Sequence, residues 1–82
     1  MNIYHISQRE NTGYDTYDEA VVVAKSARDA RSIDPSTRDG TWEEDDYVRA
    51  WCSSPKEVKA ERIGKALGTM KRGIVCSSFH AG

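Results

Sequence analysis

The chain has 82 residues, with 12 basic and 13 acidic side chains, a formal net charge of −1 and a 38% share of hydrophobic residues. This length can supply one hydrophobic core, so we expect a single domain over residues 1–82. The balanced charge lacks the basic footprint of non-specific DNA binding, and no stretch approaches the roughly 20 apolar residues that cross a bilayer. We therefore expect no direct nucleic-acid binding and no membrane association.

The first part of the chain predicts two strands joined by a polar turn. Residues 2–7 alternate around three apolar side chains, which is typical of a strand. Residues 8–18 are polar, and Gly13 can supply the positive φ of a turn. The valine-rich run 20–24 is apolar on both faces, so we expect a strand covered on both sides. A helix should cover one side, and either the middle of the chain or a second subunit the other.

A short helix is expected after the second strand. Ser26 and Asp29 have the spacing of a capping box, which predicts that the helix begins just after Ser26. Apolar residues recur every three positions and predict a narrow stripe facing the sheet. They are Ala27, Ala30 and Ile33. Because a proline pushes the preceding residue out of the helical region, the helix should end at Asp34-Pro35.

The second part predicts a long loop followed by two strands. Residues 35–55 are expected to form an ordered loop with a short helical or extended piece. Pro55 begins a tight turn or a single helical turn. Residues 58–66 predict a strand, although their Lys, Ala and Glu content also allows a helix. A turn at 68–73 and a last strand at 74–79 complete an α+β fold. We expect about four strands in a mostly antiparallel sheet with one helix packed on it, in the order β-β-α-long loop-β-β.

Residues that commonly carry catalysis are few and poorly spaced for it. His5 and His80 are the only histidines, and Cys52 and Cys76 lie far apart with no CxxC pair. A zinc site needs three or four ligands held together, and no phosphate-binding loop or nucleophile elbow occurs. We therefore expect no enzyme, no catalytic residue, no metal and no cofactor. Both cysteines are expected to be free thiols, with a disulfide as the alternative.

Two segments are candidates for binding a protein partner. Within 42–51, acids lie between large aromatic side chains, and a polar-aromatic loop lies at 14–18. Aromatic side chains give large contact areas at low entropic cost, and acids can meet a basic surface such as a nucleic-acid groove. The candidate partner-binding residues are Trp42, Glu43, Glu44, Asp45, Asp46, Tyr47, Trp51, Tyr14 and Tyr17.

Two plainer interpretations of the same segments stay open. Tyr14 and Tyr17 can cover the core while Asp15 and Asp18 cap turns. The acids can form a solvated loop or the first turn of a helix, where the helix dipole favours negative charge.

Both ends of the chain resemble a group of short phage and prophage proteins. The first match is NTGYDTYDEAVVVA at 11–24, followed by Ser26 and the Ala30-Arg31 pair, and the second is GIVCSSFHAG at 73–82. The group opens with NGYDTYD-A-VV-A and ends in ASF-AG, so the resemblance covers about half of the chain and not residues 36–55. It implies a phage accessory gene, a class that includes inhibitors of bacterial defence such as anti-CRISPR proteins. It carries over no catalytic residue.

Two functional hypotheses follow. The first is a phage-encoded accessory protein that binds and inhibits a host protein or ribonucleoprotein defence complex through protein–protein contact. Residues 1–5 lack a basic leader and an apolar signal core, so we expect it in the host cytoplasm. The alternative is an oligomeric sponge for a small molecule or signalling nucleotide, with the tyrosine loop stacking a base and Lys71-Arg72 contacting phosphate. A homodimer is also among the expected partners.

Overall fold

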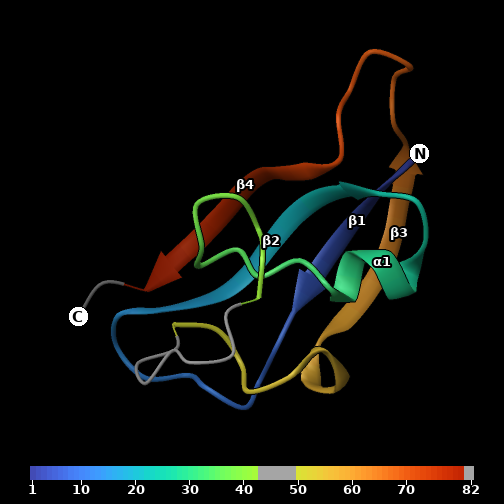
Figure 1. Ribbon diagram of the computed structural model, residues 1–82. Helices are drawn as coiled ribbons and strands as arrows, with labels where there is room; N and C mark the ends of the chain where they lie inside the picture. Colours follow the sequence, from blue (N-terminus) through green and yellow to red (C-terminus); the bar gives the residue numbers. More distant parts are fainter. Residues whose placement is uncertain (43–49, 81–82) are drawn as a thin grey trace.

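Four antiparallel strands and one short α-helix make up the fold, in a computed structural model that describes residues 1–42 and 50–80. The strands are β1 (Asn2–Ser7), β2 (Thr16–Ala24), β3 (Lys59–Lys65) and β4 (Gly73–His80) (Figure 1). The helix is α1 (Ala27–Arg31), and a 3₁₀ helix, η1 (Pro55–Glu57), precedes β3. The strands lie in the order β3-β1-β2-β4, and each neighbouring pair is antiparallel. The predicted α+β fold and its order of elements are confirmed.

The helix begins as the capping-box spacing predicts. The Ser26 hydroxyl accepts the Asp29 N–H at 3.1 Å, and the Asp29 carboxylate accepts the Lys25 N–H at 3.0 Å. The predicted end at Asp34-Pro35 is wrong, because α1 already ends at Arg31. Ser32 is its C-cap, and the Ser32 hydroxyl donates to the Asp29 carbonyl at 2.6 Å. Serine side chains compete in this way with the helical hydrogen-bond pattern. No helix in the described part of the chain is long and apolar enough to span a membrane.

The hydrophobic core lies on one face of the sheet. β1 and β2 contribute alternate side chains to it, as the two-residue period of a strand requires. The strand residues are Tyr4, Ile6, Ala20, Val22 and Ala24, and the covering residues are Ala30, Ile33, Trp51, Cys52 and Val58. The described part of the middle segment therefore covers the same face as α1, and Trp51 is only 1% exposed.

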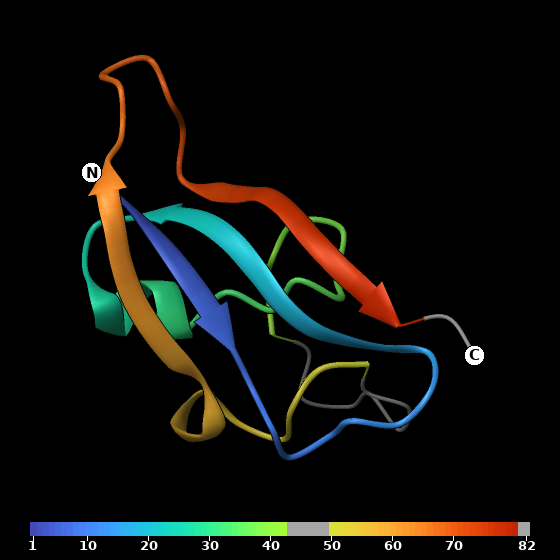
Figure 2. The same ribbon diagram turned by 180° about the vertical axis from the view of Figure 1, so that it is seen from behind.

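The opposite face of the sheet has no covering layer among the described residues, and in Figure 2 the strands lie in front of α1. Val23 on this face is buried, but Val21 is half-buried and its partner in β4, Cys76, is exposed. The described part of the middle segment, residues 35–42 and 50–55, does not supply the second cover that we expected for residues 20–24. A second subunit in that place stays a prediction.

Both edge strands contain a bulge at a branched apolar residue. Ile63 in β3 lies between two residues that pair with consecutive positions of β1. Val75 in β4 occupies the equivalent place against β2. Both side chains are largely exposed, Ile63 at 56% and Val75 at 52%. A bulge bends its strand and re-aims the extra side chain, so each bulge presents its apolar side chain to solvent at an edge of the sheet.

The turns are built partly by residues other than those expected. Asp15, and not Gly13, has the positive φ in the loop between β1 and β2, at 60°. Aspartate tolerates this left-handed conformation better than most residues. Gly40 also has a positive φ, 81°, and a Cβ there would lie 3.1 Å from the Ile33 side chain. The predicted turn at Pro55 is confirmed, since Pro55 is the first residue of η1.

Candidate functional site

An exposed cluster of aromatic side chains lies where β2 begins and β4 ends. It consists of Tyr14, Tyr17, Phe79 and His80, and we call it the aromatic end. The Tyr14 and His80 rings meet edge to face with centroids 5.3 Å apart, and the Tyr17 and Phe79 rings lie 4.9 Å apart. Tyr14 is 72% exposed and Phe79 is 47% exposed, whereas Tyr17 packs partly against the core. The aromatic end therefore continues from the core to the surface.

The backbone around Tyr14 is ordered by short hydrogen bonds. The Asp15 N–H donates to the His80 carbonyl at 2.6 Å, which joins the loop to the end of β4. The Thr16 hydroxyl, itself buried, donates to the Gly13 carbonyl at 2.6 Å. These bonds enclose Tyr14 on both sides in the sequence. The backbone that carries the Tyr14 ring is therefore held in place, which lowers the entropic cost of using this residue in binding.

Gln8 anchors the rest of this loop from inside the protein. Its side chain is 4% exposed and donates to the carbonyls of Asn11, at 2.6 Å, and of Tyr17, at 3.0 Å. The side-chain carbonyl of Gln8 accepts the Asn11 backbone N–H at 2.8 Å. The Asn11 side chain in turn donates to the Trp51 carbonyl at 3.0 Å. The loop between β1 and β2 is thus tied to the core at several points.

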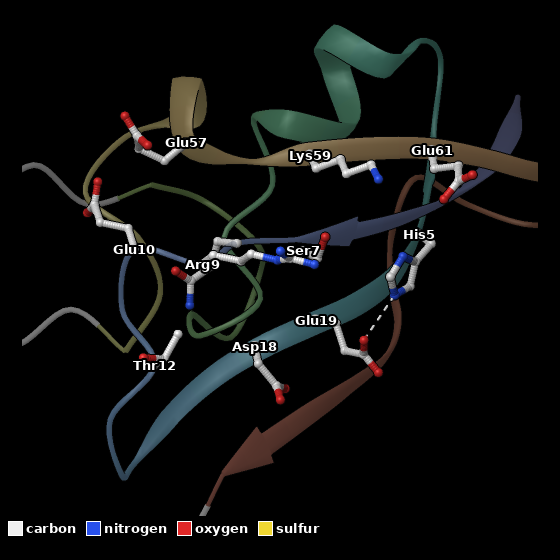
Figure 3. Close-up of a pocket in the computed structure, with 11 residues that line it drawn as sticks. His5, Ser7, Arg9, Glu10, Thr12, Asp18, Glu19, Glu57, Lys59 and Glu61 are labelled. Atoms are coloured by element: carbon white, nitrogen blue, oxygen red, sulfur yellow. Dashed lines mark hydrogen bonds and ion pairs between the residues drawn. The ribbon is translucent and has the colours of Figure 1, made fainter.

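A hollow of about 990 Å³ lies on the open face of the sheet (Figure 3). Strands β1, β2 and β3, the loop after β1 and the end of η1 line it. The lining residues are His5, Ser7, Gln8, Arg9, Glu10, Thr12, Asp18, Glu19, Glu57, Lys59 and Glu61. Carboxylates outnumber the cationic side chains in this set, so we call it the acidic hollow. Its field favours a positively charged ligand or protein surface.

Contacts within the acidic hollow are few. His5 Nε2 lies 3.2 Å from a Glu19 carboxylate oxygen, and both side chains are partly exposed. Glu10 accepts the Ser53 N–H at 2.8 Å and the Ser53 hydroxyl at 2.9 Å. Activation of a serine by histidine needs a hydrogen bond between them. In the part of the chain that the structure describes, no such bond joins Ser7 to His5.

No group of three or more metal-ligating side chains converges within residues 1–42 and 50–80. Cys52 is buried and Cys76 is exposed, and both are free, as predicted. Burial raises the pKa of the Cys52 thiol from 9.0 to about 11. A thiol with so high a pKa is a poor nucleophile and a poor metal ligand at neutral pH.

The predicted partner-binding residues separate into three groups. Tyr14 and Tyr17 lie together in the aromatic end. Trp42 packs partly against the core, and Trp51 is a core residue that is only 1% exposed, so its side chain offers no surface to a partner. A large ring fills the volume that a core poor in leucine and phenylalanine leaves open. The remaining candidates, Glu43, Glu44, Asp45, Asp46 and Tyr47, lie outside the described residues.

The structure adds Phe79 and His80, which sequence reasoning missed. Phe79 pairs with Tyr17, and His80 pairs with Thr16, so the β2–β4 pairing joins distant parts of the chain.

The residues expected to stack a nucleotide base and those expected to contact its phosphate lie at opposite ends of β4. Lys71-Arg72 precedes the strand and the tyrosines adjoin its end, roughly 20 Å away at 3.3 Å per residue. A single chain does not bring them together.

The aromatic end and the acidic hollow both include residues of the loop between β1 and β2, Tyr14 in the first and Thr12 in the second. Comparisons with protein-family models, with curated proteins and with solved structures find no match for this chain.

Proposed function

We propose that the chain is a phage-encoded accessory protein that binds and inhibits a host protein complex by protein–protein contact, in the manner of an anti-CRISPR protein. The exposed Tyr14 ring, held edge to face against His80, carries the proposal. An ordered exposed tyrosine buries a large area on binding and loses little conformational entropy. The resemblance of both chain ends to short phage proteins supports a defence complex in the host cytoplasm as the target.

The acidic hollow supports a basic protein surface as the contact. Its carboxylates repel nucleic-acid phosphates and attract lysine and arginine side chains. Proteins that hold nucleic acid do so with lysine and arginine. A ribonucleoprotein defence complex therefore has the surface chemistry that this face of the sheet would recognise.

The test compares Tyr14→Ala with Leu67→Ala. Both side chains are 72% exposed, and only Tyr14 belongs to the aromatic end. Each variant is expressed in a bacterium with an active CRISPR defence, which is then challenged with a phage that the defence targets. Affinity capture followed by mass spectrometry identifies the bound complex in the same cells.

We expect the wild type and Leu67→Ala to raise phage plating and to capture the same defence complex. Tyr14→Ala should reduce both the rise in phage plating and the amount of captured complex at least about tenfold. This is the loss expected when an interface residue that contributes much of the binding free energy is truncated. No rise in plating with the wild type would exclude the anti-defence function. Equal capture by Tyr14→Ala would exclude the aromatic end as the contact surface.

A further inference from the structure

The two edge strands of the sheet differ in charge. β3 carries four charged side chains in seven residues, Lys59, Glu61, Arg62 and Lys65. β4 carries none from Gly73 to Phe79 and ends at His80. Charged side chains on an edge strand prevent pairing with further strands, and natural proteins use them for this purpose. Charge therefore protects the β3 edge from pairing, whereas the β4 edge has only its bulge at Val75 as protection.

The uncharged edge is also accessible. Residues 75–80 of β4 are all exposed, and β2 is the only strand that pairs with β4 in the described part of the sheet. Figures 1 and 2 show no described strand or helix beyond it. In an edge strand, alternate residues direct their N–H and C=O groups away from the sheet. These groups form a ready template for one more antiparallel strand.

We propose that β4 pairs with β4 of a second copy of this chain, antiparallel across a two-fold axis at Ser77. Two copies of an uncharged strand meet without like-charge repulsion, whereas many other strands would bring charges into an apolar contact. The resulting continuous sheet has β3 at both outer edges. Because β3 is charged, no third copy can add, and the assembly closes at two.

We place the two-fold axis at Ser77 because this register brings exposed apolar side chains of the two copies together. In this register Val75 lies opposite Phe79 of the partner subunit, and the two-fold axis repeats the contact. Val75 is 52% exposed and Phe79 47% exposed in the single chain. Directly opposed side chains in an antiparallel pair have Cβ atoms roughly 4.5–5.5 Å apart. The dimer therefore removes both side chains from water in one step.

Ile63 provides a matched control for Val75. Both are branched apolar residues at bulges, both are about half exposed, and they lie on opposite edges of the sheet. The experiment is analytical ultracentrifugation of the full chain as wild type, Val75→Lys and Ile63→Lys. Circular dichroism of each variant confirms that the fold is kept, since both positions are open to solvent.

We expect the wild type and Ile63→Lys to sediment at twice the 9.2 kDa of the chain, and Val75→Lys to sediment as a monomer. A monomeric wild type overturns the proposal. So does a Val75→Lys variant that stays dimeric, because the interface then lies elsewhere. Wild-type assemblies larger than two copies overturn the closure argument.

A cysteine variant tests the register. Replacing Cys76 with Ser and Ser77 with Cys places the only exposed thiol on the two-fold axis, because Cys52 is buried. Mild oxidation should give a covalent dimer on a non-reducing gel, and the Cys76→Ser variant alone should give none. A dimer that forms no such cross-link overturns the Ser77 axis. Phe79 belongs to both the dimer contact and the aromatic end, but the two tests stay distinguishable, because Val75→Lys lies outside the aromatic end and Tyr14→Ala lies outside β4.

Discussion

Arg72 binds both carboxylate oxygens of Asp29, which lies 43 positions earlier in the chain. The Arg72 Nε–H donates to each oxygen at 3.0 Å, and a terminal nitrogen lies 2.9 Å from Oδ1. That terminal nitrogen also donates to the Ser32 hydroxyl at 3.1 Å. Since Asp29 is part of the α1 cap and Arg72 directly precedes β4, this pair fixes the start of the outer strand against the helix.

Removal of this ion pair should lower stability by a modest amount. We expect Arg72→Ala to reduce the free energy of unfolding by about 0.5–1 kcal/mol, because the pair is bidentate but partly exposed. Arg72→Lys keeps the charge and loses the two-oxygen geometry, so its effect should be intermediate. Urea denaturation followed by circular dichroism measures both. An Arg72→Ala variant with the same free energy of unfolding as the wild type would mean that the pair contributes nothing to stability.

The same pair predicts a loss of stability in acid. The hydrogen bond from Arg72 holds the pKa of the Asp29 carboxyl below its ordinary value of 3.8. The stabilisation that the Arg72–Asp29 pair gives to the folded state is therefore complete above pH 3.8. It is lost as the pH falls through the lower pKa that Asp29 has in the folded state. The difference in unfolding free energy between wild type and Arg72→Ala should be constant at higher pH and shrink in that acidic window. A difference that stays constant through the window contradicts the assignment.

Trp51 should be among the most sensitive core positions. Trp51→Ala leaves a large cavity and should cost about 3–5 kcal/mol of unfolding free energy. Within the described residues, the buried Trp51 Nε1–H has no hydrogen-bond partner. Trp51→Phe removes that unsatisfied donor, so it should cost at least about 1 kcal/mol less than Trp51→Ala. Thermal and urea unfolding of the two variants measure this difference. Equal losses of unfolding free energy in Trp51→Phe and Trp51→Ala would count against an unsatisfied indole N–H.

The two cysteines should differ in reactivity. Cys76 is exposed, whereas Cys52 is buried with a pKa raised to about 11. Iodoacetamide at neutral pH should therefore modify Cys76 in the native protein and Cys52 only after unfolding. Peptide mass spectrometry over a time course gives the order directly. Modification of Cys52 at the same rate as Cys76 would show that the core around Trp51 opens readily.

The elements of this fold were predictable where their causes are neighbours in the sequence. Ser26 and Asp29 lie three residues apart, and their side chains and backbone meet without help from the rest of the chain. The alternation in residues 2–7 likewise specified β1. The end of α1 was not predictable from Pro35, because the nearer Ser32 hydroxyl caps the helix first.

The candidate site was predictable only in part, because most of it depends on contacts between distant residues. Tyr14 and Tyr17 come from one loop and could be singled out together. Trp51 resembles a surface aromatic next to an acidic segment, and only its packing against β1 and β2 makes it a core residue. The acidic hollow combines residues such as Glu19 and Glu61 from separate strands. Their proximity depends on a strand order that no local pattern specifies.

The strand order also determines when the molecule can fold. β1 and β2 are made first but lie in the centre of the sheet, and both of their outer neighbours come after residue 58. The β1–β2 hairpin therefore keeps two unpaired edges during synthesis until residues 59–80 have been added. Pairings between such distant segments form slowly, since the loop-closure entropy must be overcome before the contacts contribute. The nascent chain is thus most exposed to aggregation just before its outer strands emerge.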